Sequence, residues 1–307
     1  MALRRDDVER AAARIRGHVR RTPVAEVERG LFLKLEGTQH SGSFKVRGAF
    51  NRILGAAEDG ALPASGVIAA SGGNHGLAVA YAARSLGIRA EIFVPEVCAP
   101  VKIEGLRRLG ADVTVTGAIY AEAYEASRKR AADTGALEIH AYDQADVAAG
   151  QGTVGAELLD QIPGGVDTVL VAVGGGGLVA GIVAAVDGRA SVVAVEPERI
   201  PTLHRALEAG EPVRVEVGGV GADALGASVA GRIALDTVAG RVSSVLVTDD
   251  AIVEARRALW REHRVAAEYA GAAALAALRS GVYAARDGER VAVVVCGANT
   301  DPATLAD

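Results

Sequence analysis

Residues 168–178, with the sequence Thr-Val-Leu-Val-Ala-Val-Gly-Gly-Gly-Gly-Leu, join a run of apolar residues directly to four consecutive glycines. The apolar run is typical of a buried strand, and helix-like sequence begins at Leu178. Glycines between a strand and a helix let backbone N–H groups approach an anion, because no side chain stands in the way. A purely structural role is disfavoured, because glycine loses more conformational entropy on folding than other residues. This stretch therefore predicts an α/β protein with an anion-binding turn at Gly174, Gly175, Gly176 and Gly177.

The same alternation of short apolar runs and helix-like segments extends in both directions from this turn. Strands are expected at Val67–Ala70, Ala90–Val94, Asp112–Val115, Asp167–Val173, Ser191–Val195 and Arg290–Val295. Helices are expected at Val46–Leu54, Asn74–Leu86, Pro100–Leu109, Ile119–Thr134, Asp250–Glu262 and Gly271–Arg279. This rhythm favours parallel sheets that are covered by helices on both faces.

The chain length of 307 residues suggests about two domains. No Pro- or Ser-rich linker divides the chain, so we expect the two domains to be interleaved. A small domain, residues 66–143, is expected to be inserted into a large domain built from residues 1–65 and 144–307. Ligands of open α/β sheets bind beyond the carboxyl ends of the strands, which is where the glycine-rich turns lie.

Composition narrows the classes of function. Half of the residues are hydrophobic and 23% are charged, which allows a large core and argues against global disorder. The net charge of −5 gives no electrostatic basis for binding nucleic acid or an anionic membrane. The sequence contains neither an apolar run long enough for a membrane span nor a stretch of the signal-peptide type. Cys98 and Cys296 are far apart and have no CxxC spacing, so neither a disulfide framework nor a zinc site is indicated and a cytoplasmic protein is expected.

One of the chain's four lysines stands in an unusual context. Lys45 lies in residues 41–48, Ser-Gly-Ser-Phe-Lys-Val-Arg-Gly, just before a helix-like stretch. Small residues around it allow the backbone to approach a ligand closely, and a cation in a first helical turn opposes the helix dipole. A desolvated lysine avoids this conflict, because burial favours the neutral, nucleophilic amine. The alternative is a solvated lysine near a helix end, the usual state of this residue type.

A second glycine-rich turn, residues 71–76, Ser-Gly-Gly-Asn-His-Gly, directly follows a predicted strand. Its free N–H groups can hold a carboxylate or phosphate, and Asn74 offers both a hydrogen-bond donor and an acceptor. The alternative is an ordinary tight turn in which Asn74 caps the next helix and His75 makes a structural hydrogen bond.

Two further features leave alternatives open. Cys296 ends the last predicted strand before a glycine, so it is either a small buried apolar residue or a ligand contact. Residues 175–180 also satisfy the G-x-G-x-x-G/A fingerprint, and Glu196 follows Gly177 by nineteen residues, where a ribose-binding acid is expected. A nicotinamide-dependent dehydrogenase is therefore an alternative hypothesis, although it leaves Lys45 and the Asn74 turn unexplained.

Taken in order, the four motifs resemble those of fold-type II pyridoxal-phosphate (PLP) enzymes. The segments are Ser-x-Lys-x-Arg-Gly at 43–48, Ser-Gly-Gly-Asn-His-Gly at 71–76, the four glycines at 174–177 and Cys-Gly-Ala-Asn at 296–299. The resemblance covers nearly the whole chain and is strongest to the serine/threonine dehydratase and serine racemase group. It implies a tryptophan-synthase-β-like fold of two interleaved parallel-sheet domains, one PLP per chain and a homodimer.

The resemblance also implies residue roles. Lys45 would hold PLP as a Schiff base and take the substrate's α-proton. Phe44 would pack against the pyridine ring, Asn74 would hydrogen-bond the phenolic oxygen and Cys296 would face the pyridine nitrogen. The remaining residues are implied to cradle the phosphate (Gly174, Gly175, Gly176, Gly177) and to surround the substrate carboxylate (Ser71, Gly72, Gly73, His75).

These roles favour one reaction. A neutral thiol at the pyridine nitrogen weakens the ring as an electron sink, which disfavours transamination and leaves β-elimination accessible. We therefore expect dehydration and deamination of L-threonine or L-serine to a 2-oxo acid and ammonia. Related racemases usually carry a serine, which serves as a second acid or base, at the position of Gly72. Glycine there favours a lyase.

Other outcomes remain open at this point. The alternatives are a serine racemase on the same scaffold, a substrate with a larger or acidic β-substituent, and a non-catalytic amino-acid-binding module. Tyr269 stands where the group usually has proline, which leaves the substrate open. Glu196 matches a divalent-metal ligand of some relatives, but Thr202 replaces a later acidic ligand, so the sequence leaves a metal site undecided.

Overall fold

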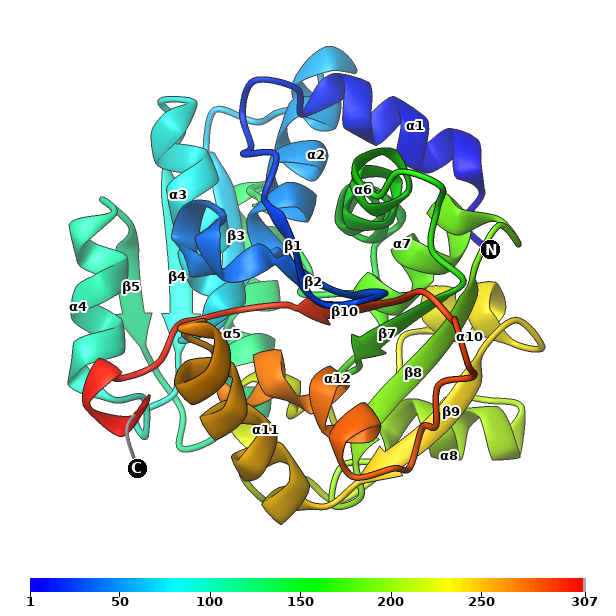
Figure 1. Cartoon of the computed structure of the whole chain (residues 1–307). Coiled ribbons are helices and arrows are strands. Elements are labelled where there is room, and N and C mark those ends of the chain that lie inside the picture. Colours follow the sequence, from blue (N-terminus) through cyan, green and yellow to red (C-terminus); the bar gives the residue numbers. More distant parts are fainter. Residues whose placement is uncertain (306–307) are drawn as a thin grey trace.

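The computed structural model describes residues 1–305 and contains two β-sheets (Figure 1). The six-stranded sheet has the order β1-β2-β10-β7-β8-β9, and only β1 and β2 pair antiparallel within it. The four-stranded sheet has the order β5-β4-β3-β6 and is parallel throughout. The strands are β1 (Val24–Glu28), β2 (Leu31–Leu35), β3 (Val67–Ala70), β4 (Ala90–Val94), β5 (Asp112–Val115), β6 (Leu137–Glu138), β7 (Thr168–Ala172), β8 (Ser191–Pro197), β9 (Ser243–Val247) and β10 (Val291–Val295).

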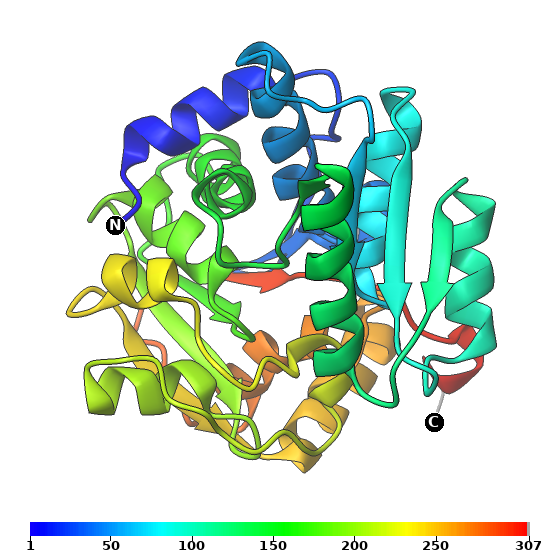
Figure 2. The same ribbon diagram turned by 180° about the vertical axis from the view of Figure 1, so that it is seen from behind.

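Helices cover both faces of each sheet, as Figures 1 and 2 show from opposite sides. On the six-stranded sheet, α12 packs across β7, β8, β9 and β10, while α7 lies on the other side against α1, α6 and α10. On the four-stranded sheet, α3 packs against β3, β4 and α2, and α5 packs against β3 and β4. The α-helices are α1 (Arg5–Arg14), α2 (Lys45–Glu58), α3 (Asn74–Ser85), α4 (Pro100–Arg108), α5 (Tyr120–Thr134), α6 (Ala145–Gln161), α7 (Gly177–Val186), α8 (Thr202–Ala209), α9 (Ala222–Leu225), α10 (Arg232–Val238), α11 (Asp249–His263) and α12 (Tyr269–Arg279).

The α/β class with two parallel-containing sheets confirms the predicted fold class. The four-stranded sheet uses strands between residues 67 and 138, whereas the six-stranded sheet takes strands from both ends of the chain. We retain residues 66–143 as a proposed small domain and residues 1–65 with 144–307 as a proposed large domain.

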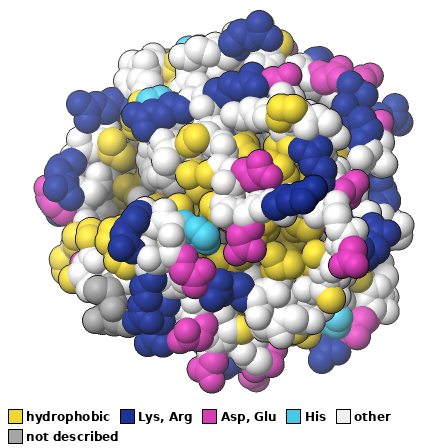
Figure 3. Space-filling model, viewed as in Figure 1, with side chains coloured by type: hydrophobic (Ala, Val, Ile, Leu, Met, Phe, Trp, Pro, Cys, Tyr) yellow, Lys and Arg dark blue, Asp and Glu magenta, His cyan; other side chains and the backbone are white. Residues whose placement is uncertain are grey.

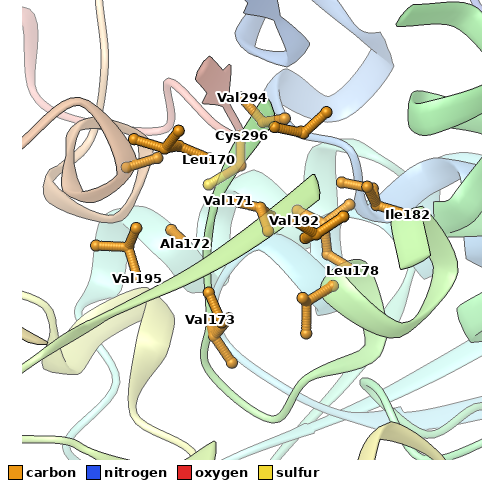
Figure 4. Packing of buried hydrophobic residues seen from close by; sticks show 14 of the residues in the cluster. Leu170, Val171, Ala172, Val173, Leu178, Ile182, Val192, Val195, Val294 and Cys296 are labelled. Atoms are coloured by element: carbon orange, nitrogen blue, oxygen red, sulfur yellow. The ribbon is translucent and has the colours of Figure 1, made fainter. Parts of the chain in front are cut away.

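The centre of the six-stranded sheet forms the core. All residues of β7 and of α7 are buried, which suits a central parallel strand and the helix that follows it. Figure 4 shows Leu170, Val171 and Ala172 of this strand together with Leu178, Val192 and Cys296. Because this core surrounds the tetraglycine turn, the turn is held between two closely packed elements.

Several elements differ from the sequence-based expectation. Strand β2 was not predicted, because its sequence Leu-Phe-Leu-Lys-Leu carries a lysine. In the structure this lysine, Lys34, is fully buried, and its ion pair with Glu157 compensates for the burial of its charge. Helix α6 was not predicted either, because Gly150 and Gly152 lower helix propensity. A β-carbon at Gly152 would lie 2.6 Å from the Gly181 carbonyl oxygen, so these glycines allow close packing of helices.

Charged side chains of both signs are interspersed on the face of the molecule shown in Figure 3. Within residues 1–305, no helix has the length and hydropathy needed to cross a membrane.

Candidate active site

A cavity that is partly open to solvent lies at the carboxyl ends of β7 and β10. Helices α2, α3, α7 and α12 each begin at or beside one of its lining residues, and helix N-termini favour bound anions. The cavity brings together eight residues predicted from the sequence: Phe44, Lys45, Asn74, Gly174, Gly175, Gly176, Gly177 and Cys296. It is also lined by Tyr142, Leu225 and Glu268, which sequence reasoning did not assign.

Lys45 is the first residue of α2 and is half-buried. Its Nζ donates a hydrogen bond of 2.8 Å to the Ala141 carbonyl oxygen and lies 5.3 Å from the centroid of the Phe44 ring. Desolvation lowers the pKa of Lys45 to about 8, although Cys296 and Glu268 partly oppose this shift. A lower pKa raises the fraction of neutral amine at physiological pH, and the neutral amine is the nucleophile.

The tetraglycine turn joins β7 to α7 and leaves no room for side chains. A β-carbon on Gly175 would lie 2.3 Å from the Tyr142 ring, and one on Gly176, where φ is +93°, would lie 2.4 Å from the Ala234 side chain. Within residues 1–305, none of the four glycine N–H groups donates a hydrogen bond to another part of the chain. Unpaired N–H groups at a helix N-terminus suit a phosphate, so the turn fits the phosphate-binding role expected of it.

Cys296 lies directly after β10 and is buried, and its Sγ donates to the Ala270 carbonyl oxygen at 3.5 Å. Burial raises the pKa of the thiol strongly, and the nearby Glu268 carboxylate adds to the shift. Cys296 is therefore a neutral thiol at physiological pH, as the elimination hypothesis requires.

Asn74 is the first residue of α3, and its carboxamide is held by two side chains from the far end of the chain. Its Nδ2 donates to Glu268 Oε1 at 2.6 Å, and its Oδ1 accepts from Asn299 Nδ2 at 2.7 Å. Glu268 is only 7% exposed, and burial raises the pKa of its carboxyl group to about 7. The sequence signal for Glu268 was an acidic residue next to the start of a helix. It was missed because the helix was predicted to begin at Gly271, whereas α12 begins two residues earlier, at Tyr269.

Tyr142 was also missed, because it follows the two-residue strand β6 in a stretch without a strand–glycine–helix pattern. Its hydroxyl donates to the Val229 carbonyl oxygen at 3.1 Å, and its ring packs edge-on against His140. These contacts hold the ring over the tetraglycine turn.

The four residues predicted to surround a substrate carboxylate lie outside the lining of this cavity. The N–H of Gly73 donates to Ser71 Oγ at 3.2 Å, and Gly72 faces the Cys98 thiol. His75 is buried, its Nε2 lies 2.8 Å from the Ile139 carbonyl oxygen, and burial lowers its pKa to about 3. This hydrogen bond is the structural alternative considered for His75, and the carboxylate-binding role of the turn stays a prediction.

The Glu196 side chain caps the N-terminus of α8. Its two carboxylate oxygens accept from the N–H groups of Leu203 and His204, at 2.6 and 2.7 Å, and burial raises its pKa to about 7. The carboxylate therefore caps α8, which removes the ribose-binding acid that the dehydrogenase hypothesis needs. Within residues 1–305, no cluster of three or more His, Cys, Asp or Glu residues is arranged to hold a metal ion.

Residues 15–297 match the family described as pyridoxal-phosphate dependent enzyme. The chain is 36% identical to L-threonine ammonia-lyase of Thermotoga maritima, over 96% of this chain and 75% of that protein. It is 36% identical to phenylserine dehydratase of Ralstonia pickettii, over 96% and 92% of the two chains. Among solved structures, maize serine racemase has a TM-score of 0.91 at 32% identity and covers 99% of this chain and 96% of that one. A threonine deaminase from T.th. has a TM-score of 0.88 at 35% identity and covers 97% and 99%.

Proposed function

The chain belongs to the family of pyridoxal-phosphate-dependent enzymes, and from this premise we propose that it converts L-threonine or L-serine to a 2-oxo acid and ammonia. The family, the fold class and the dependence on PLP were predicted from four short motifs, and all three are confirmed. The observation that carries the reaction is a single amine of lowered pKa, Lys45, in a cavity shared with a glycine turn and a buried, un-ionised thiol.

The residues of the cavity fit PLP. The four unpaired N–H groups of the glycine turn would hold the phosphate, and Lys45 Nζ would bond to the aldehyde carbon. Asn74 would donate to the phenolic oxygen, and Cys296 would face the ring nitrogen. When bound, PLP supplies an electron sink that acidifies the Cα–H bond of an amino acid.

The chain's own residues then decide which reaction follows. Lys45 Nζ takes the proton from the substrate Cα, for which a pKa near physiological pH is favourable. The neutral thiol of Cys296 provides no negative charge to stabilise a cation at the ring nitrogen, which favours loss of the β-hydroxyl over transamination. Tyr142 and Leu225 contribute an aromatic ring and an aliphatic side chain to the lining of the cavity.

The proposal is tested by following two products at once. The purified protein is incubated with PLP and L-threonine, L-serine or 3-phenylserine, and 2-oxo acid, ammonia and the D-enantiomer are measured in parallel. We expect equal amounts of 2-oxo acid and ammonia, with threonine or serine as the better substrate. Rapid exchange of enantiomers without 2-oxo acid would instead establish a racemase, which the similarity to maize serine racemase keeps as the second candidate. Protein that stays colourless with PLP would refute both.

The lowered pKa of Lys45 predicts how the protein freed of PLP takes the cofactor up again. Because the neutral amine attacks the aldehyde, the rate should rise with pH and level off above about 8, not above the ordinary lysine value of 10.5. Stopped-flow absorbance after mixing with PLP at different pH values measures this rate. Lys45→Ala protein is the control and should develop no visible band at any pH. A rate that continues to rise beyond pH 10.5 would contradict the assigned desolvation.

Gly72 and Cys98 predict an obstacle to racemase chemistry in this chain. A β-carbon at Gly72 would lie 2.4 Å from Cys98 Sγ, so the thiol already occupies the space of a side chain at position 72. We expect Gly72→Ser to lower the free energy of unfolding by about 1–3 kcal/mol through overpacking. Adding Cys98→Ala should recover most of this loss.

Denaturant unfolding of Gly72→Ser, Cys98→Ala and the double variant measures this coupling. Chiral chromatography then tests whether the stable double variant gains enantiomer exchange over the wild type. Equal stability of Gly72→Ser and the wild type would contradict the steric argument.

The oligomeric state and the cell compartment belong to the same proposal. We propose a cytoplasmic homodimer, on the basis of the resemblance to the dehydratase group. Light scattering coupled to size-exclusion chromatography measures the mass, which should be twice the chain mass of 31.3 kDa.

A further inference from the structure

We propose that Glu268 and Asn299 are positioning residues that fix the orientation of the Asn74 carboxamide, so that an N–H of Nδ2 and not the carbonyl oxygen faces PLP. The proposal rests on the proposed function only in requiring that PLP binds in this cavity. Asn74 belongs to α3 on the four-stranded sheet, whereas Glu268 precedes α12 and Asn299 follows β10 on the six-stranded sheet. The contacts therefore join the two sheets at the cavity.

The hydrogen bonds form a chain with one direction. Asn299 Nδ2 donates to the Ser41 carbonyl oxygen and to Asn74 Oδ1, both at 2.7 Å. Asn74 Nδ2 in turn donates to Glu268 Oε1 at 2.6 Å. A carboxamide can exchange its nitrogen and oxygen by rotating its terminal bond, which has broad, roughly two-fold preferences. A backbone carbonyl oxygen can only accept, and so can a carboxylate oxygen that carries no proton, so both ends of this chain favour the same orientation of Asn74.

These hydrogen bonds leave one N–H of Asn74 Nδ2 available for the cofactor. Both N–H bonds of Asn299 Nδ2 are used, one on Ser41 and one on Asn74. Asn74 Nδ2 uses one N–H on Glu268 and keeps a second, and Asn74 lines the cavity with Lys45. A donor stabilises the phenolic oxygen of PLP in its anionic form, whereas a reversed carboxamide would place a carbonyl oxygen against it. The orientation of Asn74 therefore determines whether it supports or opposes the cofactor.

Two glycines provide the space for these side chains. A β-carbon on Gly297 would lie 2.3 Å from Glu268 Oε1, and one on Gly42, where φ is +77°, would lie 2.2 Å from Asn299 Oδ1. The N–H of Glu268 also donates to the Gly297 carbonyl oxygen at 3.1 Å, and the N–H of Ala298 donates to the Gly42 carbonyl oxygen at 2.9 Å. The backbone is thus shaped closely around the carboxylate and the carboxamide.

The surroundings of Glu268 act on its carboxyl group in both directions. Burial, the largest influence, and Asp223 raise its pKa, while the hydrogen bond from Asn74 and the charges of Lys102 and Lys45 lower it. Because the carboxyl group is almost fully buried, loss of the Asn74 hydrogen bond would leave it without a hydrogen-bond donor from residues 1–305. The interaction is therefore worth more than one between exposed groups.

The test compares Glu268→Ala, Glu268→Gln and Asn299→Ala with the wild type. Two quantities are measured: the dissociation constant for PLP, and the balance between the visible and near-ultraviolet bands of bound PLP, which reports where the phenolic proton resides. We expect Glu268→Ala and Asn299→Ala each to raise the dissociation constant about tenfold and to shift the balance towards the near-ultraviolet band. Glu268→Gln should stay close to the wild type, because its carbonyl oxygen can accept from Asn74 while Asn299 still sets the direction.

Controls separate positioning from general damage. Glu211→Ala removes an exposed carboxylate and should leave both measurements unchanged. Circular dichroism and thermal unfolding identify the variants that fold. If Glu268→Ala does not fold, Asn299→Ala tests the proposal independently. Wild-type protein without a visible band would refute the proposed function itself. If the wild type binds PLP, the positioning role is overturned by folded alanine variants with wild-type binding and band balance. It is also overturned if Glu268→Gln loses as much as Glu268→Ala.

Discussion

Lys45→Ala is expected to abolish turnover of every substrate and to remove the visible band of lysine-bound PLP. The cavity offers Lys45 Nζ as the amine beside the glycine turn, and its lowered pKa suits both bonding to an aldehyde and transfer of the α-proton. The loss should be at least roughly 10⁴-fold, the upper end of what one positioned base contributes, because the covalent link is lost as well. Product assays and absorbance spectra of the same preparation measure the two effects.

The fold should survive this substitution. Lys45 contributes one hydrogen bond, to the Ala141 carbonyl oxygen, which is worth about 1 kcal/mol, and its removal also relieves the cost of a desolvated amine. Lys129→Ala, at an exposed position on α5, is the matched lysine control and should keep full activity. Turnover by folded Lys45→Ala protein would rule out the assigned role.

Arg47→Leu is expected to cause the largest loss of stability among the variants considered. The Arg47 guanidinium is 0% exposed and contacts Glu36, also 0% exposed, at 2.8 Å and Glu157 at 2.7 Å. Breaking a buried ion pair by removing one partner costs about 3–5 kcal/mol, because the other charge stays buried without compensation. Glu36 would be that charge, since Lys34 forms its ion pair with Glu157. Denaturant unfolding of the variant and the wild type measures the loss.

A second arginine of the same helix provides the control. Arg52 pairs with Asp146 at 3.0 Å near the surface, so Arg52→Leu should change the free energy of unfolding by at most about 1 kcal/mol. Adding Glu36→Leu to Arg47→Leu removes the uncompensated carboxylate and should recover part of the stability. Similar losses for Arg47→Leu and Arg52→Leu would contradict the account of the buried pair.

Local patterns were sufficient for the elements that carry the predicted site residues. Strand β7 and the start of α7 were predicted to within one residue, because an unbroken apolar run followed by glycines is a short-range signal. Strand β3 and the start of α3 at Asn74 were predicted in full for the same reason. Strand β2 was missed because a lysine, Lys34, contradicts the pattern of a buried strand, and the ion pair to Glu157 on α6 permits its burial.

The sequence by itself determined the α/β class, the family and the residues that meet in the cavity: Lys45, Asn74, the glycine turn and Cys296. Each belongs to a short motif whose chemistry can be recognised without knowledge of its neighbours in space. Only the tertiary structure decided what surrounds them, because Glu268 and Asn299 lie 194 and 225 residues from Asn74 along the chain. The lowered pKa of Lys45 and the neutral state of Cys296 likewise depend on burial, which arises only when both sheets are packed. Residue identity established which groups are present, and packing established their protonation, orientation and partners.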